Sequence, residues 1–194
     1  VKQPDLVLAL QLCCDCFDAE AKARDFAYYE QITVRDSSLS PGTLAVVAAD
    51  VGHLRLAFDY LAEAALIDLE DLEHNTRDGL HLAALAGAWT ALVAGFGGMR
   101  DHAEPIEFAP RLPHGLVRLS FALVRRGHRL RVEIGPREAT YRLVADRGEL
   151  ELVHHGRRVT VRGAEPVTLP IPPAPAREPV RQPPGREPLH RSGR

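Results

Sequence analysis

The chain has 194 residues, of which 45% are hydrophobic and 26% are charged, a balance that is ordinary for a soluble globular protein. This length is enough for one large domain, or for one and a half smaller ones, with a real hydrophobic core. The formal net charge of −2 leaves no dominant basic face and therefore argues against a nucleic-acid partner.

The chain starts at Val1, its only methionine is Met99, and an apolar helical pattern begins almost at once. We therefore expect the C-terminal portion of a longer protein, or a reading frame that begins at an unusual codon. A signal-like basic start followed by an apolar stretch is absent from the sequence, and we expect a cytoplasmic location.

The first half of the chain carries helical periodicity. Asp18 is expected to cap the second helix, Ser40 and Pro41 to open the third, and Gly52 to end it. The most apolar helix falls short of the about 20 residues of a membrane span and is rich in alanine and glycine, so it indicates a core helix. Helices are predicted at residues 4–16, 19–28, 41–50, 54–69 and 80–95.

Three cysteines fall together as Cys13, Cys14 and Cys16. A zinc site would need a second ligand pair at a defined spacing, and the sequence contains none. We expect buried structural thiols, because a free cysteine behaves as a small hydrophobe. The sequence indicates no metal and no cofactor.

A polar loop lies between the second and third predicted helices and contains Arg35, Asp36, Ser37 and Ser38. Free amides and the positive end of the helix dipole make such a helix start a natural anion site. Arg35 would add positive charge. An ordinary well-capped loop is the alternative, and both interpretations stay open. Polar groups at helix ends are the remaining site candidates: Lys2, Gln3, Glu30, Asp78 and His81.

From about residue 106 the period changes from helical to two. Strands are predicted around residues 117–123 and 130–134, and at 139–145, 149–153 and 157–162, which indicates a small antiparallel β-sandwich. Nine of the fifteen prolines lie between Pro166 and Pro188, so the tail is expected to be disordered or polyproline-like. A tail that binds a partner is the alternative.

Several motifs stand in the order and approximate spacing of glycoside hydrolase family 65, and the chain resembles that family over about residues 1–160. The family includes maltose, trehalose and kojibiose phosphorylases and acid trehalases. Gln31 stands where the family commonly has proline. The motifs are Lys2-Gln3-x-Asp5, Tyr28-Tyr29-Glu30, Asp36-Ser37-Ser38-Leu39-Ser40, Asp78-Gly79-Leu80-His81 and Gly95-Phe96-Gly97-Gly98-Met99-Arg100.

The resemblance implies an α+β multidomain fold: the last helices of an (α/α)6 barrel over residues 1–102, a small antiparallel β-sandwich over 103–165, and a disordered Pro/Arg-rich tail over 166–194. It implies inverting attack on an α-linked glucose disaccharide such as trehalose or maltose, with inorganic phosphate as co-substrate in a phosphorylase and β-glucose 1-phosphate as its product. By the same resemblance Lys2 and Gln3 would bind substrate, while Ser37, Ser38 and His81 would bind phosphate.

The family's general-acid glutamate is expected upstream of this chain, so no catalytic residue is assigned and Glu30 is not put in its place. The retained serines and His81 favour a phosphorylase over a hydrolase. A non-catalytic remnant, or a structural subunit that complements a split glycosidase, stays the alternative. The expected partners are the disaccharide, phosphate, and the N-terminal part of the same enzyme or a complementing chain; a homodimer stays open, and neither a nucleic acid nor a membrane is expected.

Overall fold

The computed structural model describes residues 1–102, 104–144 and 147–188. It divides into two compact units, a helical unit of Val1–Gly95 with the segment from Pro175 onward, and a β unit of Phe96–Ala174. The boundary between residues 95 and 96 lies close to the predicted one at residue 102, but the proline-rich end of the chain is shared between the two units. Each unit is described separately.

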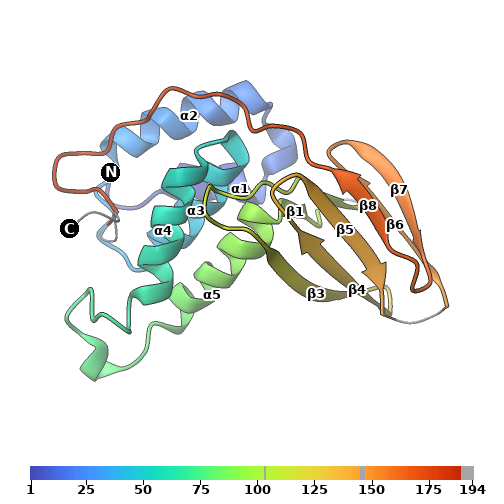
Figure 1. The fold of residues 1–194 in the computed structure, drawn as a ribbon. Coiled ribbons are helices and arrows are strands. Elements are labelled where there is room, and N and C mark those ends of the chain that lie inside the picture. Colours follow the sequence, from blue (N-terminus) through green and yellow to red (C-terminus); the bar gives the residue numbers. More distant parts are fainter. Residues whose placement is uncertain (103, 145–146, 189–194) are drawn as a thin grey trace. The chain divides into compact units, whose positions relative to one another are not determined.

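The helical unit contains five α-helices and short 3-10 turns between them (Figure 1). Asp18 caps α2, since its Oδ1 accepts a hydrogen bond of 2.7 Å from the Ala21 amide, and Gly52 ends α3 with φ 104°. Both positions are as predicted. The elements are α1 (Asp5–Leu12), η1 (Cys14–Cys16), α2 (Ala19–Ile32), α3 (Ser40–Val51), α4 (Leu54–Leu66), η2 (Thr76–Asp78) and α5 (Leu82–Thr90), and α5 continues into the π-helical turn η3 (Ala91–Phe96).

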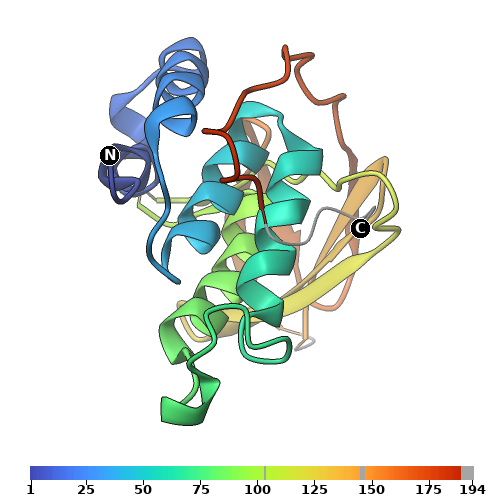
Figure 2. The same cartoon turned by 90° about the vertical axis from the view of Figure 1, so that its left-hand side faces the viewer.

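Helix α3 is the centre of the helical unit and packs against α1, α2, α4 and α5. Figure 2 shows α3, α4 and α5 side by side. Nearly every residue of α3 is buried, and most are small. A Cβ added at Gly42 would lie 2.8 Å from the Cα of Gly87 in α5, so the two backbones are in direct contact at this point.

The β unit is a sandwich of two four-stranded sheets, with the strand orders β1-β2-β6-β7 and β3-β4-β5-β8. The pair β2–β6 is parallel and the other described pairs are antiparallel, whereas the sequence predicted an antiparallel sandwich throughout. The strands are β1 (Met99–Arg100), β2 (Ile106–Phe108), β3 (Leu119–Arg125), β4 (His128–Ile134), β5 (Glu138–Leu143), β6 (Glu149–His154), β7 (Arg157–Arg162) and β8 (Val167–Pro170).

The alternation that predicted these strands is visible in their burial. In β4, Leu130, Val132 and Ile134 are buried in the core, whereas Arg129 and Arg131 are exposed. Side chains from both sheets form one hydrophobic cluster, which is the arrangement of a sandwich. The predicted end of the third of these strands at residue 145 lies outside the described residues.

The sequence predicted a disordered or polyproline-like tail, and the structure corrects this at residues 167–170, which form β8, whereas residues 171–188 contain no helix or strand. Strand β8 pairs with β5, and the following segment contacts the helical unit through side chains of residues 177, 182 and 186. Prolines favour this order because they fix an extended backbone and so lower the entropy lost on docking. Residues 189–194 of the predicted tail lie outside the described residues.

The cysteines also differ from their predicted burial. Helix α1 ends at Leu12, and the chain turns at the surface in η1, where Cys13 and Cys16 are exposed and Cys14 is half-buried. The neighbouring Asp15 carboxylate raises the pKa of the Cys16 thiol. Cys16 is therefore held further from its reactive thiolate form.

Candidate functional site

The loop from Thr33 to Leu39, which we call the serine loop, joins α2 to α3. The Thr33 hydroxyl donates to the Tyr29 carbonyl at 2.6 Å and closes the end of α2. The Ser40 amide donates to the Ser37 carbonyl at 3.1 Å, and the Leu39 amide lies 3.4 Å from the Ser37 hydroxyl. These bonds fold the loop into a turn and leave Ser37 and Ser38 half-buried directly before α3.

The start of α3 is not capped as the sequence predicted. Ser40 is the first residue of the helix and lies behind Leu39, which takes the cap position without a side-chain hydrogen bond to the described helix amides. Ser40 is buried, and its hydroxyl has no partner within the described residues. The Ser40 amide already donates to the Ser37 carbonyl and Pro41 has no N–H, so the amides of Gly42 and Thr43 are those left without a side-chain acceptor from the described residues, which suits an anion.

Arg35 anchors the serine loop rather than adding free charge to it. Its backbone has φ 58°, and its Nη1 donates to both carboxylate oxygens of Glu63 at 3.1 and 3.0 Å. The guanidinium also stacks over the Tyr60 ring, 5.0 Å from the ring centroid. The side chain is only 6% exposed, so the predicted contribution of Arg35 to anion binding is corrected to a structural one.

Glu30 lies beside this anchor and is buried. Its Oε1 accepts hydrogen bonds from the Tyr60 hydroxyl and from Gln182 Nε2, the latter at 3.0 Å. Its Oε2 has no partner within the described residues, and burial raises the pKa of the Glu30 carboxyl. Glu30 is held inside the helical unit by Tyr60, as expected for a structural carboxylate.

His81 is fixed by Asp68. The imidazole Nδ1 lies 2.7 Å from Asp68 Oδ1, and the His81 amide donates to Asp68 Oδ2 at 2.9 Å. The hydrogen bond from His81 lowers the pKa of the Asp68 carboxyl. We call these two hydrogen bonds between Asp68 and His81 the Asp68–His81 clamp. They turn Nε2 of His81 away from Asp68, so Nε2 is the nitrogen that can contact a ligand. Sequence reasoning missed Asp68, because only folding brings it to a histidine 13 residues later.

Helices α3 and α5 bring the serine loop and His81 to the same end of the helical unit. A Cβ added at Gly42 in α3 would meet Gly87 in α5. A Cβ added at Gly95, in the turn η3 that continues α5, would meet the Cα of Val46 further along α3 at 3.4 Å, so the two helices run in the same direction. The start of α3 lies two residues before Gly42, and the start of α5 lies five residues before Gly87. At 1.5 Å per residue, the two starts differ by roughly 5 Å along the axis.

The segment that carries Lys2 and Gln3 also reaches the serine loop. The Val34 amide donates to the Val1 carbonyl at 2.9 Å, so the chain before α1 runs beside the end of α2. Lys2 and Gln3 follow directly and are exposed. Asp78 lies in η2 and is also exposed, with Arg77 as its ion-pair partner at 3.8 Å. The carboxylate that binds His81 is thus Asp68 and not Asp78.

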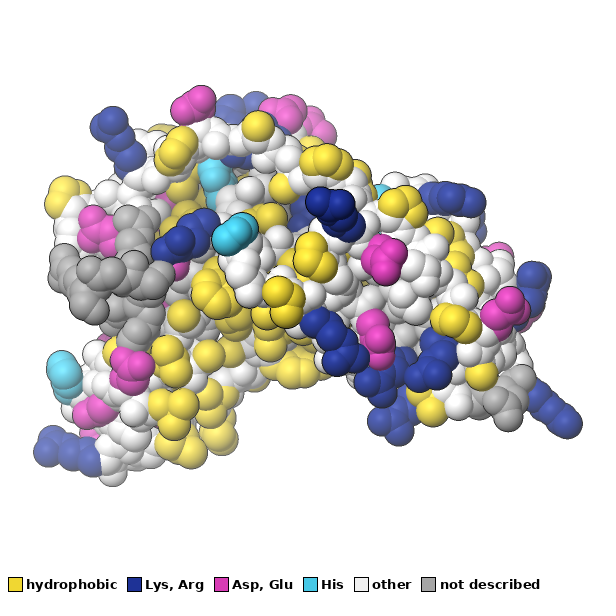
Figure 3. Space-filling view, in the orientation of Figure 1, with side chains coloured by type: hydrophobic (Ala, Val, Ile, Leu, Met, Phe, Trp, Pro, Cys, Tyr) yellow, Lys and Arg dark blue, Asp and Glu magenta, His cyan; other side chains and the backbone are white. Residues whose placement is uncertain are grey.

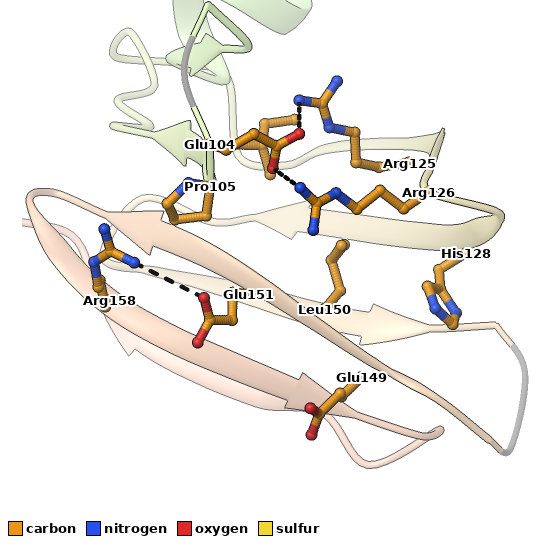
Figure 4. Close-up of a pocket in the computed structure, with 10 residues that line it drawn as sticks. Glu104, Pro105, Arg125, Arg126, His128, Glu149, Leu150, Glu151 and Arg158 are labelled. Carbon is orange, nitrogen blue, oxygen red and sulfur yellow. Dashed lines mark hydrogen bonds and ion pairs between the residues drawn. The ribbon is translucent and has the colours of Figure 1, made fainter.

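A separate pocket of about 360 Å³ lies in the β unit (Figure 4). Glu104 points between Arg125 and Arg126 and pairs with them at 2.7 and 3.1 Å, while Arg158 faces Glu151 at 3.8 Å. Its basic groups are thus already paired with carboxylates. The pocket contains none of the candidate residues, and its charge pattern does not single out a ligand.

Among the residues that the structure describes, no three or more His, Cys, Asp or Glu side chains are placed to hold a metal ion. The same residues include no helix that is long and apolar enough to cross a membrane. The apolar helix α5, with nine residues, is confirmed as too short for a span.

The helical unit leaves an apolar stripe exposed on α5. Leu82, Leu85 and Trp89 are 72%, 37% and 56% exposed, and their spacing places them on one face of the helix. Figure 3 shows hydrophobic side chains gathered along the lower edge of this unit. Exposed apolar surface of this kind is typical of sites that contact protein, membrane or ligand.

Two models of one family match successive parts of this chain. Residues 1–90 match the glycosyl hydrolase family 65 central catalytic domain, and residues 99–161 match the C-terminal domain of the same family. The chain belongs to glycosyl hydrolase family 65. The family 65 motifs at the serine loop and at His81 thus lie within the part that matches the catalytic domain.

Relatives of this family 65 chain include phosphorylases. An uncharacterized glycosyl hydrolase of Mycobacterium leprae is 53% identical over 193 residues, 98% of this chain and 24% of the relative. The α,α-trehalose phosphorylase of Thermoanaerobacter brockii is 34% identical over 165 residues, 84% of this chain and 21% of the relative. Maltose and kojibiose phosphorylases are further relatives. The chain spans about a quarter of the length of the relatives that it matches.

A solved structure supports the fold. It is of a human-microbiome protein assigned provisionally as a kojibiose phosphorylase, which shares 24% identity and superposes with a TM-score of 0.80 over 87% of this chain and 22% of that one. At this identity the likeness concerns the fold alone. Helices followed by two sheets are therefore the arrangement that this part of a phosphorylase-like protein adopts.

Proposed function

We propose that this chain forms the phosphate-side part of the active site of an inverting family 65 phosphorylase that acts on an α-linked glucose disaccharide such as trehalose or maltose. Ser37, Ser38 and His81 bind inorganic phosphate, and Lys2 and Gln3 bind the sugar. The general acid comes from protein that this chain does not contain. The observation that carries the proposal is that the serine loop and the Asp68–His81 clamp lie at the same end of α3 and α5.

The chemistry of this end suits phosphate. Two serine hydroxyls and the Gly42 and Thr43 amides of the first turn of α3 are hydrogen-bond donors at this end, and the α3 dipole favours negative charge there. Nδ1 of His81 faces Asp68, so Nε2 is the imidazole nitrogen available to the ligand. An anion bound here would be held by donors already fixed in place by Glu63 and Asp68.

The carboxylates around the serine loop favour a phosphorylase over a hydrolase. An inverting hydrolase needs a carboxylate base to activate water. Glu30 is buried against Tyr60, and Asp68 is occupied by His81. Asp36 pairs with Arg186 at 2.7 Å. None of these three carboxylates is free to activate water, which favours phosphate as the nucleophile on this side of the site.

The exposed stripe on α5 supports activity within a larger protein. Leu82, Leu85 and Trp89 would pack against the remaining part of an (α/α)6 barrel, of which α1 to α5 are the last helices. The alternative, a non-catalytic piece that completes another chain, uses the same stripe. The two differ in whether phosphate is consumed once the barrel is complete.

The test uses a hybrid enzyme in which this chain replaces the matching quarter of the Mycobacterium leprae relative, to which it is 53% identical. We expect phosphate-dependent release of glucose 1-phosphate from trehalose, maltose or kojibiose. Ser38→Ala and His81→Ala should raise the KM for phosphate about tenfold or more and change the KM for the sugar much less, because each removes a hydrogen bond to a charged ligand.

Ser120→Ala and His114→Ala are the matched controls, since both residues are exposed in the β unit. They should leave both KM values unchanged. Release of free glucose without phosphate would instead identify a hydrolase. Equal effects of Ser38→Ala and Ser120→Ala on the phosphate KM would refute the assigned phosphate site.

A further inference from the structure

The segment of residues 175–188, which we call the C-terminal strap, crosses the helical unit along α2 (Figure 1). It begins at the end of α3, where a Cβ added at Gly52 would lie 2.9 Å from the Pro175 carbonyl oxygen. Arg177 then binds both carboxylate oxygens of Glu20, at 2.9 and 2.8 Å, in the first turn of α2. The strap is thus fixed at its start by a close backbone contact and a bidentate ion pair.

The other end of the strap binds the serine loop. Arg186 Nη1 donates to Asp36 Oδ1 at 2.7 Å and to the Val34 carbonyl at 3.2 Å. In return, Arg35 donates to the backbone carbonyl of Arg186. Between the two ends, Gln182 donates to Glu30, which also binds Tyr60. The contacts of the strap join residues about 150 positions apart in the chain, and those of Arg186 lie on the loop that carries the two serines.

We propose that the C-terminal strap positions the serine loop for phosphate, with Arg186 as a positioning residue that also offsets the charge of Asp36. The Asp36 carboxylate stands one residue before Ser37 and would repel an incoming phosphate. Arg186 holds that carboxylate and the Val34 carbonyl together, and so fixes the backbone from which both serines extend. The part of this inference that concerns phosphate depends on the proposed function; the part that concerns loop order does not.

The strap lies outside the residues matched by the two family models, which end at residue 161. The match to the Mycobacterium leprae relative covers 98% of the chain and thus extends into the strap, whereas the match to the trehalose phosphorylase covers 84%. The strap contact is therefore a feature beyond what the family models describe.

The first experiment measures amide hydrogen exchange in the full chain and needs no activity. Arg186→Ala should speed exchange of the amides of residues 34–38 by about three- to tenfold, since it removes a charge-assisted contact that is about half exposed. Deletion of residues 175–194 should have a larger effect on the same amides. Arg181→Ala is the matched control, because Arg181 is exposed and makes no ion pair within the described residues. Unchanged amide exchange in both Arg186→Ala and the deletion variant would overturn the proposal that the strap positions the serine loop.

The second experiment measures kinetics in the hybrid enzyme. Arg186→Ala should raise the phosphate KM about threefold or more and leave the sugar KM unchanged, whereas a general loss of structure would alter both. Arg186→Lys keeps the charge and should restore most of the phosphate affinity. If Ser38→Ala raises the phosphate KM and Arg186→Ala does not, the positioning role is overturned while the proposed function stands. If Ser38→Ala also has no effect, the proposed function itself fails.

Discussion

The contact between Gly42 and Gly87 gives a pair of substitutions with opposite expected effects. A Cβ at Gly42 would lie 2.8, 3.1 and 3.2 Å from backbone atoms of Gly87, which cannot move aside as a flexible side chain can. A Cβ at Gly87 would meet Gly42 only at 3.4 Å, which is ordinary van der Waals contact. An alanine at position 42 would therefore collide with the backbone of α5, whereas an alanine at position 87 would fit against α3.

The magnitudes follow from this difference. Overpacking costs about 1–3 kcal/mol, and because the obstacle at Gly42 is backbone we take the upper part of this range, about 2–3 kcal/mol, of which the gain in helix propensity offsets at most about 1 kcal/mol. Gly87→Ala has that gain with little steric cost. For a unit of about this size, 1 kcal/mol shifts Tm by roughly 4–8 °C. We expect Gly42→Ala to lower Tm by about 4–15 °C, and Gly87→Ala to leave it unchanged or to raise it by a few degrees.

The assay is thermal unfolding of the full chain, followed by the helical signal at 222 nm. In the hybrid enzyme, Gly42→Ala should also raise the phosphate KM, because separating α3 from α5 moves the serine loop away from His81. A Tm for Gly42→Ala within 1 °C of that of the unaltered chain, or equal decreases for the two variants, would refute the close parallel packing of these helices.

Three further predictions concern single side chains. Burial raises the pKa of Glu30, so ionisation of this carboxyl opposes folding once the pH rises above the ordinary pKa of a glutamate. Glu30→Gln should therefore be as stable as the unaltered chain at pH 4 and more stable at pH 7, as measured by urea unfolding. Burial, with His154 and Arg111 nearby, lowers the pKa of His155 to about 4. Its contribution to stability is therefore complete above pH 6.5 and is lost as the pH falls toward 4, and His155→Gln should weaken this dependence. Trp89 is the only tryptophan of this chain and is 56% exposed. Its fluorescence in the hybrid enzyme, taken as the difference between the hybrid and its Trp89→Phe variant, should lie at shorter wavelength than in this chain alone; an equal wavelength would contradict contact through α5.

Local patterns in the sequence predicted the elements that local physics controls. Asp18 caps α2 and Gly52 ends α3 because each satisfies backbone groups within a few residues. The strands were predicted by alternation that matches the burial of one sheet face. The parallel pairing of β2 with β6 was not predicted, since it joins segments more than forty residues apart.

Composition alone predicted neither the strand and contacts of the tail nor the exposure of the cysteines. A proline-rich segment without large apolar residues cannot form its own core, but it can dock on an existing one when its few polar side chains find partners. Arg177 and Arg186 find such partners in Glu20 and Asp36. Conversely, the cysteines were predicted to be buried from residue type, whereas the position of the turn after α1 decided their exposure.

The candidate site shows the same division between local and long-range information. The sequence indicated an anion site from the serines and the start of α3, which are neighbours in the chain. It assigned Arg35 the wrong role because Glu63, its partner, lies on another helix. His81 likewise owes its orientation to Asp68. The donors of the proposed phosphate site are thus encoded locally, whereas the groups that hold them in place come from distant segments. It follows that substitutions at Glu63, Asp68 and Arg186 should weaken phosphate binding without removing any group that touches phosphate.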